Sequence, residues 1–185
     1  MQQIFGGLFG AFLATAGFAQ AVVLPVSTGQ PQALQAYVTG YSYWDNTPPG
    51  TVDISHPVTH DFAGGMGTYS NPVTLAVGHQ IINGEDLLDF PAGTRFYLPR
   101  LRKYAIVEDT CGDGPTPQNG PCHTGKNGLF WLDIYIDGVS FAKGVSEACM
   151  QDITGVQPVI MDPEPNMSVV VGPVTEGGCF IFPDP

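Results

Sequence analysis

Basic residues are scarce in this chain of 185 residues. Lysine and arginine total 6 against 17 aspartates and glutamates, which gives a formal net charge of −11 at pH 7. Proteins bind nucleic acids and anionic membranes mainly through clustered basic side chains, so neither is expected as a partner. An acidic surface is compatible with a neutral or cationic polysaccharide, and we expect a monomer that binds such a ligand.

Charged residues of either sign are also few. They make up 12% of the chain, whereas glycine (24 residues) and proline (17 residues) are abundant. This composition disfavours long surface helices and favours a turn-rich all-β domain. Because aromatic residues reach 11%, the chain has enough apolar surface for one core. We therefore expect a single all-β domain over residues 22–185.

Long apolar runs are missing beyond the first residues. Residues 4–16 are apolar or small, and Ala19-Gln20-Ala21 has the small-x-small form of a cleavage site. This pattern predicts a secretory signal peptide over residues 1–21 and a secreted mature chain that begins near Val22. The run is short and interrupted by glycine, which disfavours a membrane span.

The four cysteines contain no CxxC pair, which disfavours a zinc site. An even number of cysteines in a secreted chain indicates two disulfides, and three pairings are possible. We favour Cys111–Cys122, which closes the loop 112–121, and Cys149–Cys179, which ties the tail to the domain.

Other familiar catalytic patterns are absent as well. No Gly-x-Ser-x-Gly or Cys/His arrangement supports nucleophilic acyl chemistry. His56 and His60 are spaced i, i+4, but Pro57 disfavours a helix that would bring both to one metal. We expect no metal and no organic cofactor, and we predict instead that His79 contacts the substrate.

Short strand-like segments alternate with turn signals along the mature chain. Residues 78–90 are predicted to form a loop, and the glycine-rich residues 63–69 a loop that permits close backbone approach. The predicted strands are 36–44, 73–77, a pair within 93–107, 129–136, 156–161 and 167–171, with a short helix at 146–153.

One aspartate interrupts an otherwise apolar strand. In residues 130–136, alternation puts Asp133 on one face with Trp131 and Tyr135, and the aliphatic residues on the other. A carboxyl group beside aromatic rings is partly desolvated, which raises its pKa and suits a general acid. The local pattern equally allows an edge-strand aspartate that hydrogen-bonds a neighbouring loop.

Three further aspartates lie at strand ends. Asp109 precedes Cys111 at the mouth of the disulfide loop, Asp45 precedes a Pro-Pro-Gly turn, and Asp137 follows the strand of Asp133. Glycoside cleavage needs one carboxylic acid, and inverting hydrolysis needs a second carboxylate that activates water. Asp109 and Asp45 also fit ordinary turn chemistry, in which the side chain accepts backbone N–H bonds.

Aromatic residues supply possible sugar-stacking surfaces. Core packing is the alternative for about half of them. The predicted groove residues are Tyr41, Tyr43, Trp44, Tyr69, Trp131 and Tyr135.

The segments 93–99, 104–110 and 132–136 resemble the three-aspartate (3D) domain of membrane-bound lytic transglycosylase A, which is a double-psi β-barrel. The resemblance implies that Asp133 is the catalytic acid and Asp109 its supporting aspartate. Tyr43-Trp44-Asp45 is similar to the strand that carries the catalytic base in family-45 glycoside hydrolases, which share this barrel. The implied fold is a six-stranded double-psi β-barrel with long loops, one or two short helices and two disulfides.

Residues 41–50, 63–74, 93–111 and 131–133 together resemble secreted fungal muramidases built on the same barrel. This resemblance implies hydrolysis of the MurNAc–GlcNAc β-1,4 bond of bacterial peptidoglycan. Two other functions remain open. One is a hydrolase of β-glucan or chitin, and the other is an expansin-like wall-binding module, which would keep the acid but lack the base.

Overall fold

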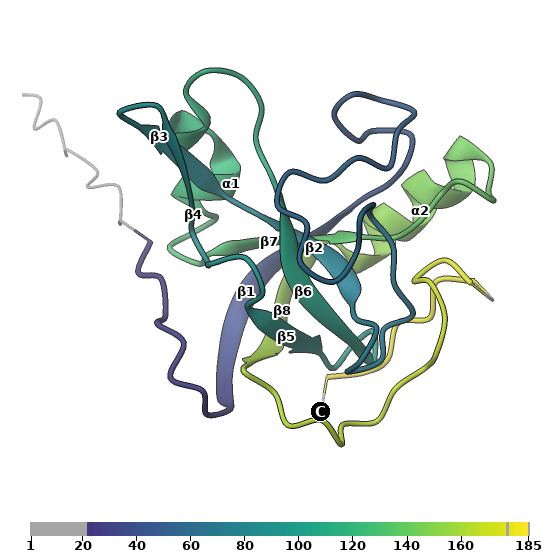
Figure 1. Ribbon diagram of the computed structural model, residues 1–185. Coiled ribbons are helices and arrows are strands. Elements are labelled where there is room, and N and C mark those ends of the chain that lie inside the picture. Colours follow the sequence, from purple (N-terminus) through teal and green to yellow (C-terminus); the bar gives the residue numbers. More distant parts are fainter. Residues whose placement is uncertain (1–21, 177, 185) are drawn as a thin grey trace, which may run out of the picture.

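The computed structural model describes residues 22–176 and 178–184 (Figure 1). The predicted signal peptide, residues 1–21, lies outside the described residues. Six strands close into a barrel in the order β1-β7-β2-β6-β5-β8, so the predicted all-β barrel is confirmed. The strands are β1 (Gln32–Tyr41), β2 (Val73–Val77), β5 (Arg95–Leu98), β6 (Lys103–Thr110), β7 (Trp131–Tyr135) and β8 (Gly155–Met161).

Two parallel strand pairs interlock within this otherwise antiparallel barrel. Strand β1 runs parallel to β7, and β2 runs parallel to β6, while β2 pairs antiparallel with β7 between them. The remaining pairs, β1–β8, β5–β6 and β5–β8, are antiparallel. This is the double-psi arrangement expected from the sequence, and it brings β7 between β1 and β2.

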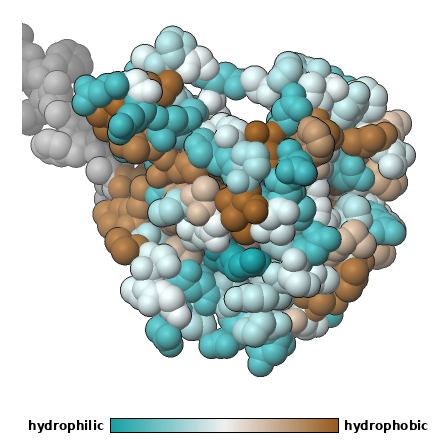
Figure 2. All heavy atoms as spheres, viewed as in Figure 1, coloured by the Kyte–Doolittle hydropathy of each residue, from teal (hydrophilic) through white to brown (hydrophobic). Residues whose placement is uncertain are grey.

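The core follows the alternation of the strands. In β7, Leu132 and Ile134 are fully buried, and all five residues of β2 are buried. Phe90, Phe96 and Phe130 pack edge-on or tilted against one another in the buried core. On the face seen in Figure 1, hydrophobic and hydrophilic groups are interspersed over the surface (Figure 2).

The prediction of a loop at residues 78–90 was wrong. Residues His79–Ile82 (β3) and Glu85–Leu88 (β4) form an antiparallel hairpin outside the barrel. Its turn is Asn83-Gly84, and both residues have positive φ. Asn-Gly is the favoured dipeptide for a two-residue hairpin turn, so this signal was present in the sequence.

The prediction of a strand at residues 167–171 was also wrong. This segment is held to the barrel by single hydrogen bonds rather than by a ladder: Val170 N–H donates to the Arg102 carbonyl, and Tyr97 donates its hydroxyl proton to the Ser168 carbonyl. The first strand begins and ends earlier than predicted, at residues 32–41 rather than 36–44.

Both predicted disulfides are confirmed, Cys111–Cys122 and Cys149–Cys179. The helices are short. They are the 3-10 helix η1 (Pro117–Asn119), α1 (Pro121–Thr124) and α2 (Lys143–Ile153), which contains the predicted helix 146–153. None of the helices in the described part of the chain is long and apolar enough to cross a membrane.

Candidate active site

A row of paired residues crosses four barrel strands and carries two of the predicted aspartates. Asp133 of β7 pairs with Thr39 of β1 on one side and with Ala76 of β2 on the other. Ala76 pairs in turn with Asp109 of β6. Because neighbouring strands lie about 4.8 Å apart, the two aspartate backbones are about 10 Å apart. The small side chain of Ala76 leaves the space between their carboxyl groups open.

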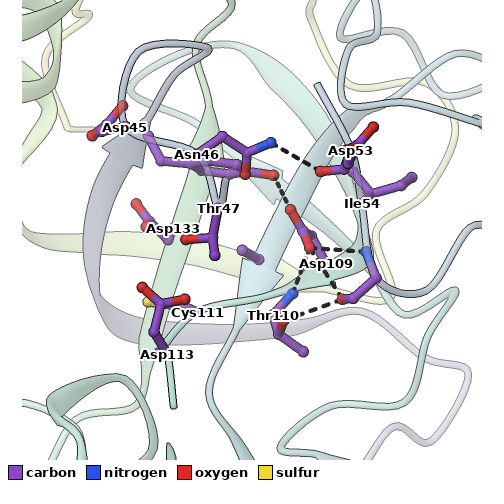
Figure 3. A pocket seen from close by; sticks show the side chains of 14 residues that line it. Asp45, Asn46, Thr47, Asp53, Ile54, Asp109, Thr110, Cys111, Asp113 and Asp133 are labelled. Carbon is purple, nitrogen blue, oxygen red and sulfur yellow. Dashed lines mark hydrogen bonds between the residues drawn. The ribbon is translucent and has the colours of Figure 1, made fainter. Parts of the chain in front are cut away.

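Asp133, Ala76 and Asp109 of this row line a cavity of about 360 Å³. Residues of the loop 45–55, the end of β6 and the loop that follows it, residues 109–113, line this cavity. The cavity brings together Asp133, Asp109 and Asp45, three residues far apart in the sequence (Figure 3). Two further aspartates that the sequence analysis did not select, Asp53 and Asp113, also line it.

Asp133 has the properties of a proton donor. Its pKa is raised from 3.8 to about 7: burial is the largest cause, a hydrogen bond from Thr39 opposes the shift, and the negative charges of Asp45 and Asp109 add to it. Thr39 Oγ1 donates to Asp133 Oδ1 over 2.6 Å and accepts from the indole nitrogen of Trp131 over 2.7 Å. Oδ1 of Asp133 is therefore occupied, which leaves Oδ2 to carry the acidic proton into the cavity.

Asp109 is held rigidly. Its Oδ2 accepts the Tyr41 hydroxyl over 2.9 Å. Its Oδ1 accepts from the backbone N–H and the hydroxyl of Ser55 and from the backbone N–H of Thr110 (Figure 3). Four donors to one buried carboxyl group make Asp109 a fixed acceptor, and its charge acts on Asp133. The turn-capping role considered from the sequence is thus also present.

Asp45 lies at the exposed rim of the cavity. Its Oδ1 accepts from the backbone N–H and the hydroxyl of Ser42, over 2.8 and 2.7 Å, which is the turn chemistry considered from the sequence. No described residue donates to its Oδ2. The carboxylate is therefore positioned by one oxygen and has the other free to meet a water molecule.

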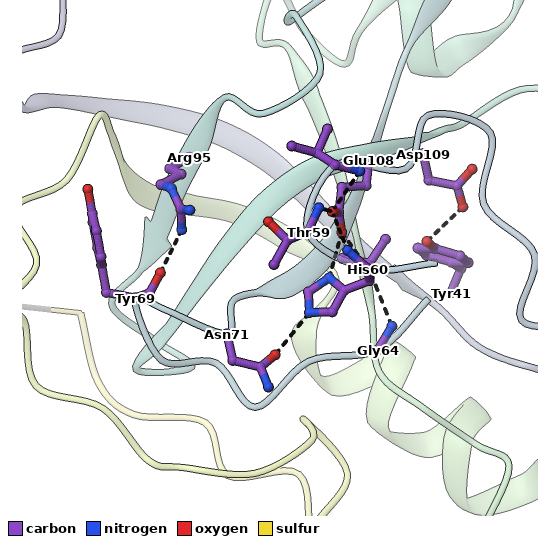
Figure 4. Close-up of polar contacts among 11 residues, drawn as sticks. Tyr41, Thr59, His60, Gly64, Tyr69, Asn71, Arg95, Glu108 and Asp109 are labelled. Carbon is purple, nitrogen blue, oxygen red and sulfur yellow. Dashed lines mark hydrogen bonds and ion pairs between the residues drawn. The ribbon is translucent and has the colours of Figure 1, made fainter. Parts of the chain in front are cut away.

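A β-bulge in β6 determines which of two consecutive carboxyl groups pairs with Ala76. Leu75 pairs with Val107 and Ala76 pairs with Asp109, so Glu108 is the extra residue. Glu108 is fully buried. Its Oε1 accepts the backbone N–H groups of residues 58, 59 and 60, and its Oε2 lies 2.7 Å from Nδ1 of His60 (Figure 4). Glu108 thereby anchors residues 58–60. The residues just before them, 53–55, line the cavity.

Of the predicted groove aromatics, the structure brings only Tyr41 to the cavity wall. Trp131 does not line the cavity. Its indole N–H donates to the Thr39 hydroxyl, which in turn donates to Asp133. Tyr43 and Trp44 pack edge-on against each other, and the Trp44 indole donates to the Phe141 carbonyl. Tyr135 lines a separate cavity.

Tyr69 and His79 also lie outside the cavity. Tyr69 borders a groove beside Arg95, whose guanidinium lies 4.8 Å from the ring centroid (Figure 4). Nδ1 of His79 lies 2.6 Å from Asp86 and its Nε2 lies 2.8 Å from the Gly112 carbonyl oxygen. His79 therefore ties the β3–β4 hairpin to the loop that follows Cys111, which is a supporting position rather than one in contact with the cavity. Within residues 22–176 and 178–184, no group of three His, Cys, Asp or Glu side chains is arranged to hold a metal ion.

Comparison with known proteins gives two matches. A family model described as the DDB_G0273701 N-terminal domain matches residues 33–180, a span that contains all three predicted aspartates. A Dictyostelium discoideum protein, uncharacterized protein DDB_G0273701/DDB_G0273221, is 28% identical over 167 residues, or 89% of this chain and 68% of that protein. No solved structure gives a significant match.

Proposed function

This chain belongs to the DDB_G0273701 N-terminal domain family, and we propose that it is a secreted glycoside hydrolase of the muramidase type. Its substrate would be the β-1,4-linked glycan of bacterial peptidoglycan. The observation that carries the proposal is Asp133, whose pKa burial raises to about 7 and which shares one cavity with four other aspartates, Asp45 and Asp109 among them. The two disulfides and the polysaccharide-compatible charge agree with an extracellular role.

In the proposed reaction, Asp133 Oδ2 donates its proton to the glycosidic oxygen as the bond to the leaving sugar breaks. Asp45 accepts a proton from the attacking water through its free oxygen. Asp109 is fixed by its hydrogen bonds, and its negative charge adds to the effect of burial in raising the pKa of Asp133. Because donors engage both Asp109 oxygens, we assign it no role as a nucleophile, which favours an inverting reaction.

The direct test replaces Asp133 with asparagine. Asp133→Asn keeps an oxygen that can accept from Thr39 but removes the acidic proton, so release of reducing ends should fall about 10²- to 10⁴-fold. Peptidoglycan, β-glucan and chitin are assayed side by side, and product masses distinguish hydrolysis from anhydro-sugar formation.

Asp152→Asn is the matched control, because Asp152 is exposed on α2 and the chemical change is the same. Its activity should equal that of the unmodified protein. Undiminished activity of Asp133→Asn would rule out Asp133 as the acid. If the unmodified protein binds glycan but releases no product from any of the three, it is a wall-binding module instead.

A further inference from the structure

The outer face of strands β1 and β7 carries two aromatic rings beside the candidate acid. Tyr37 pairs with Trp131 across the two strands, and the next pair on the same face is Thr39 with Asp133. Side chains two positions apart in a strand point to the same face and lie about 6–7 Å apart along it. Leu132, between them, points into the core and is fully buried. The two rings, here called the aromatic platform, therefore lie about one sugar unit from the acid.

The aromatic platform is accessible and is connected to the acid. Both rings are partly exposed, so a ligand can touch them, and they pack edge-on with centroids 4.5 Å apart. The Trp131 indole N–H donates to Thr39 over 2.7 Å, and the Thr39 hydroxyl donates to Asp133 over 2.6 Å. Asp133 itself lines the cavity of the aspartates, here called the aspartate cavity. A glycan that reaches the acid through this cavity can therefore extend over the platform, where the apolar face of a sugar ring can stack.

A basic side chain lies at the edge of the platform. The Lys126 ammonium is 5.8 Å from the centroid of the Tyr37 ring, and the side chain is exposed. Two backbone hydrogen bonds with Leu129, each 2.9 Å, fix Lys126 in the turn that precedes β7. Within residues 22–176 and 178–184, Lys126 forms no ion pair with a carboxylate. In a chain with a formal net charge of −11, this ammonium is placed to bind a negatively charged substituent of a sugar on the platform.

We propose that the aromatic platform is the sugar subsite next to the cleaved bond, and that Lys126 binds a carboxylate of the peptide that peptidoglycan sugars carry. A ring bound over Trp131 places its linkage to the next ring near Asp133, one pair of residues along the strands. A neutral glycan such as chitin uses the platform but gains nothing from Lys126. The choice of ligand rests on the proposed glycan-cleaving function, and it names the substrate class as a glycan with acidic peptide substituents.

The test uses Trp131 as its own reporter. The chain has two tryptophans, Trp44 and Trp131, so the emission of a Trp44→Phe variant comes from Trp131 alone. Asp133→Asn is added so that binding is measured without cleavage. The probes are the N-acetylglucosamine tetramer of chitin, which is neutral, and a peptidoglycan tetrasaccharide that retains its peptides. Both should change the Trp131 emission in a saturable way.

Two results of this titration overturn the proposal. One is binding of the peptidoglycan probe in calorimetry with no change in Trp131 emission, as expected if Trp131 only supports Thr39. The other is no binding of the peptidoglycan probe at all.

Tyr37→Ala tests the second ring of the platform. It should weaken binding of both probes about 3- to 10-fold, whereas the control Tyr37→Phe keeps the ring and should bind like its parent. Equal binding by the two variants overturns the proposal. The fluorescence titration needs neither of them, so it decides the question even if Tyr37→Ala does not fold.

Lys126→Gln tests the recognition of the peptide carboxylate. It should weaken binding of the peptidoglycan probe about 2- to 5-fold at low ionic strength, with a smaller loss at high salt, and leave the neutral tetramer unchanged. Lys143→Gln is the matched control, since Lys143 is an exposed lysine of α2 that lies 3.7 Å from Glu147. Equal binding of the peptidoglycan probe by the two variants, or an equal loss for the neutral tetramer, overturns the role of Lys126.

Failure of the proposed function gives a different pattern. If the unmodified protein releases no product from any glycan, yet Trp131 responds to both probes and Tyr37→Ala weakens them, the subsite stands and the hydrolase proposal falls. If product is released and Trp131 does not respond to a bound probe, the hydrolase proposal stands and the subsite falls.

Discussion

Two side chains on neighbouring strands determine what the aspartate cavity can do. Thr39 occupies one oxygen of Asp133, and Trp131 holds Thr39 in place. Burial and two nearby carboxyl groups then keep a proton on the other oxygen of Asp133. A carboxylic acid that is still protonated near pH 6 can serve as a general acid, which an exposed aspartate cannot.

This acidity predicts how activity and stability depend on pH. Activity should fall as pH rises through about 7, because Asp133 then loses its proton. The folded state holds a proton that the unfolded state releases near pH 3.8, so between about pH 4 and about pH 7 the folded protein loses stability as pH rises. The Asp133→Asn variant lacks this contribution to the dependence of stability on pH. Urea unfolding from pH 4 to 8 should show the variant gaining stability relative to the parent, and parallel curves would contradict the assignment.

At the residue level, sequence reasoning predicted the aspartates better than the aromatics. The alternation of residues 130–136 correctly gave the buried aliphatic face of β7. The cavity gathers Asp133, Asp109 and Asp45 as the resemblance implied. The direction of an aromatic side chain depends on its neighbours across strands, which local spacing does not encode, so Tyr69 and Trp44 lie outside the cavity.

Among the elements, strand β6 carries the feature that shapes the site. Two consecutive carboxyl groups of this strand lie in different surroundings: Asp109 faces the cavity, and Glu108 binds the loop at residues 58–60. Consecutive side chains of a strand point to opposite faces, so the two groups would diverge even in a regular strand. The bulge shifts the register by one residue, so that Asp109 rather than Glu108 pairs with Ala76.

Removal of the Glu108 carboxyl group should loosen that loop. Glu108→Ala leaves three backbone N–H groups and His60 without their acceptor, so we expect a loss of about 2–4 kcal/mol in unfolding free energy. Limited proteolysis should cut first within residues 56–62. Glu85→Ala, at an exposed position of β4, is the control and should change stability by less than about 0.5 kcal/mol. Equal protease resistance in the two variants would show that Glu108 does not hold the loop.

The sequence predicted strand β6 but not its bulge. The apolar run at residues 104–107 indicated the strand, but a bulge exists only relative to a partner, here β2. The partner is parallel and far away in sequence, so no local pattern specifies the register. Glu108 was not predicted from the sequence, where its one signal is a glutamate beside an aspartate at the end of an apolar strand.

Across the whole molecule, the two disulfides have different tasks. Cys111–Cys122 spans 11 positions and fixes the loop whose residues 111–113 line the cavity. Cys149–Cys179 spans 30 positions and joins α2 to the C-terminal segment, away from the cavity. The cysteine spacing alone left three pairings possible, and the structure realises the one that closes two separate loops.

Removal of each bridge should separate stability from activity. On the basis of loop length, C149A/C179A should lose about 3.6 kcal/mol of unfolding free energy and C111A/C122A about 2.8 kcal/mol. Activity should follow the opposite order, because only the shorter loop borders the aspartates. Denaturant unfolding and glycan cleavage measured on both variants test this. A larger activity loss in C149A/C179A, measured under conditions where both are folded, would contradict it.

The interlocked parallel pairs also have a consequence for the order in which the protein forms. Thr39 and Asp133 are 94 positions apart, and Tyr41 and Asp109 are 68 apart, so the site needs contacts across more than a third of the chain. Long-range pairings of this kind close slowly, whereas the β3–β4 hairpin closes locally. We expect the acid to acquire its proton-holding environment only at the last step of folding, so that the protein becomes active and protease-resistant at the same moment.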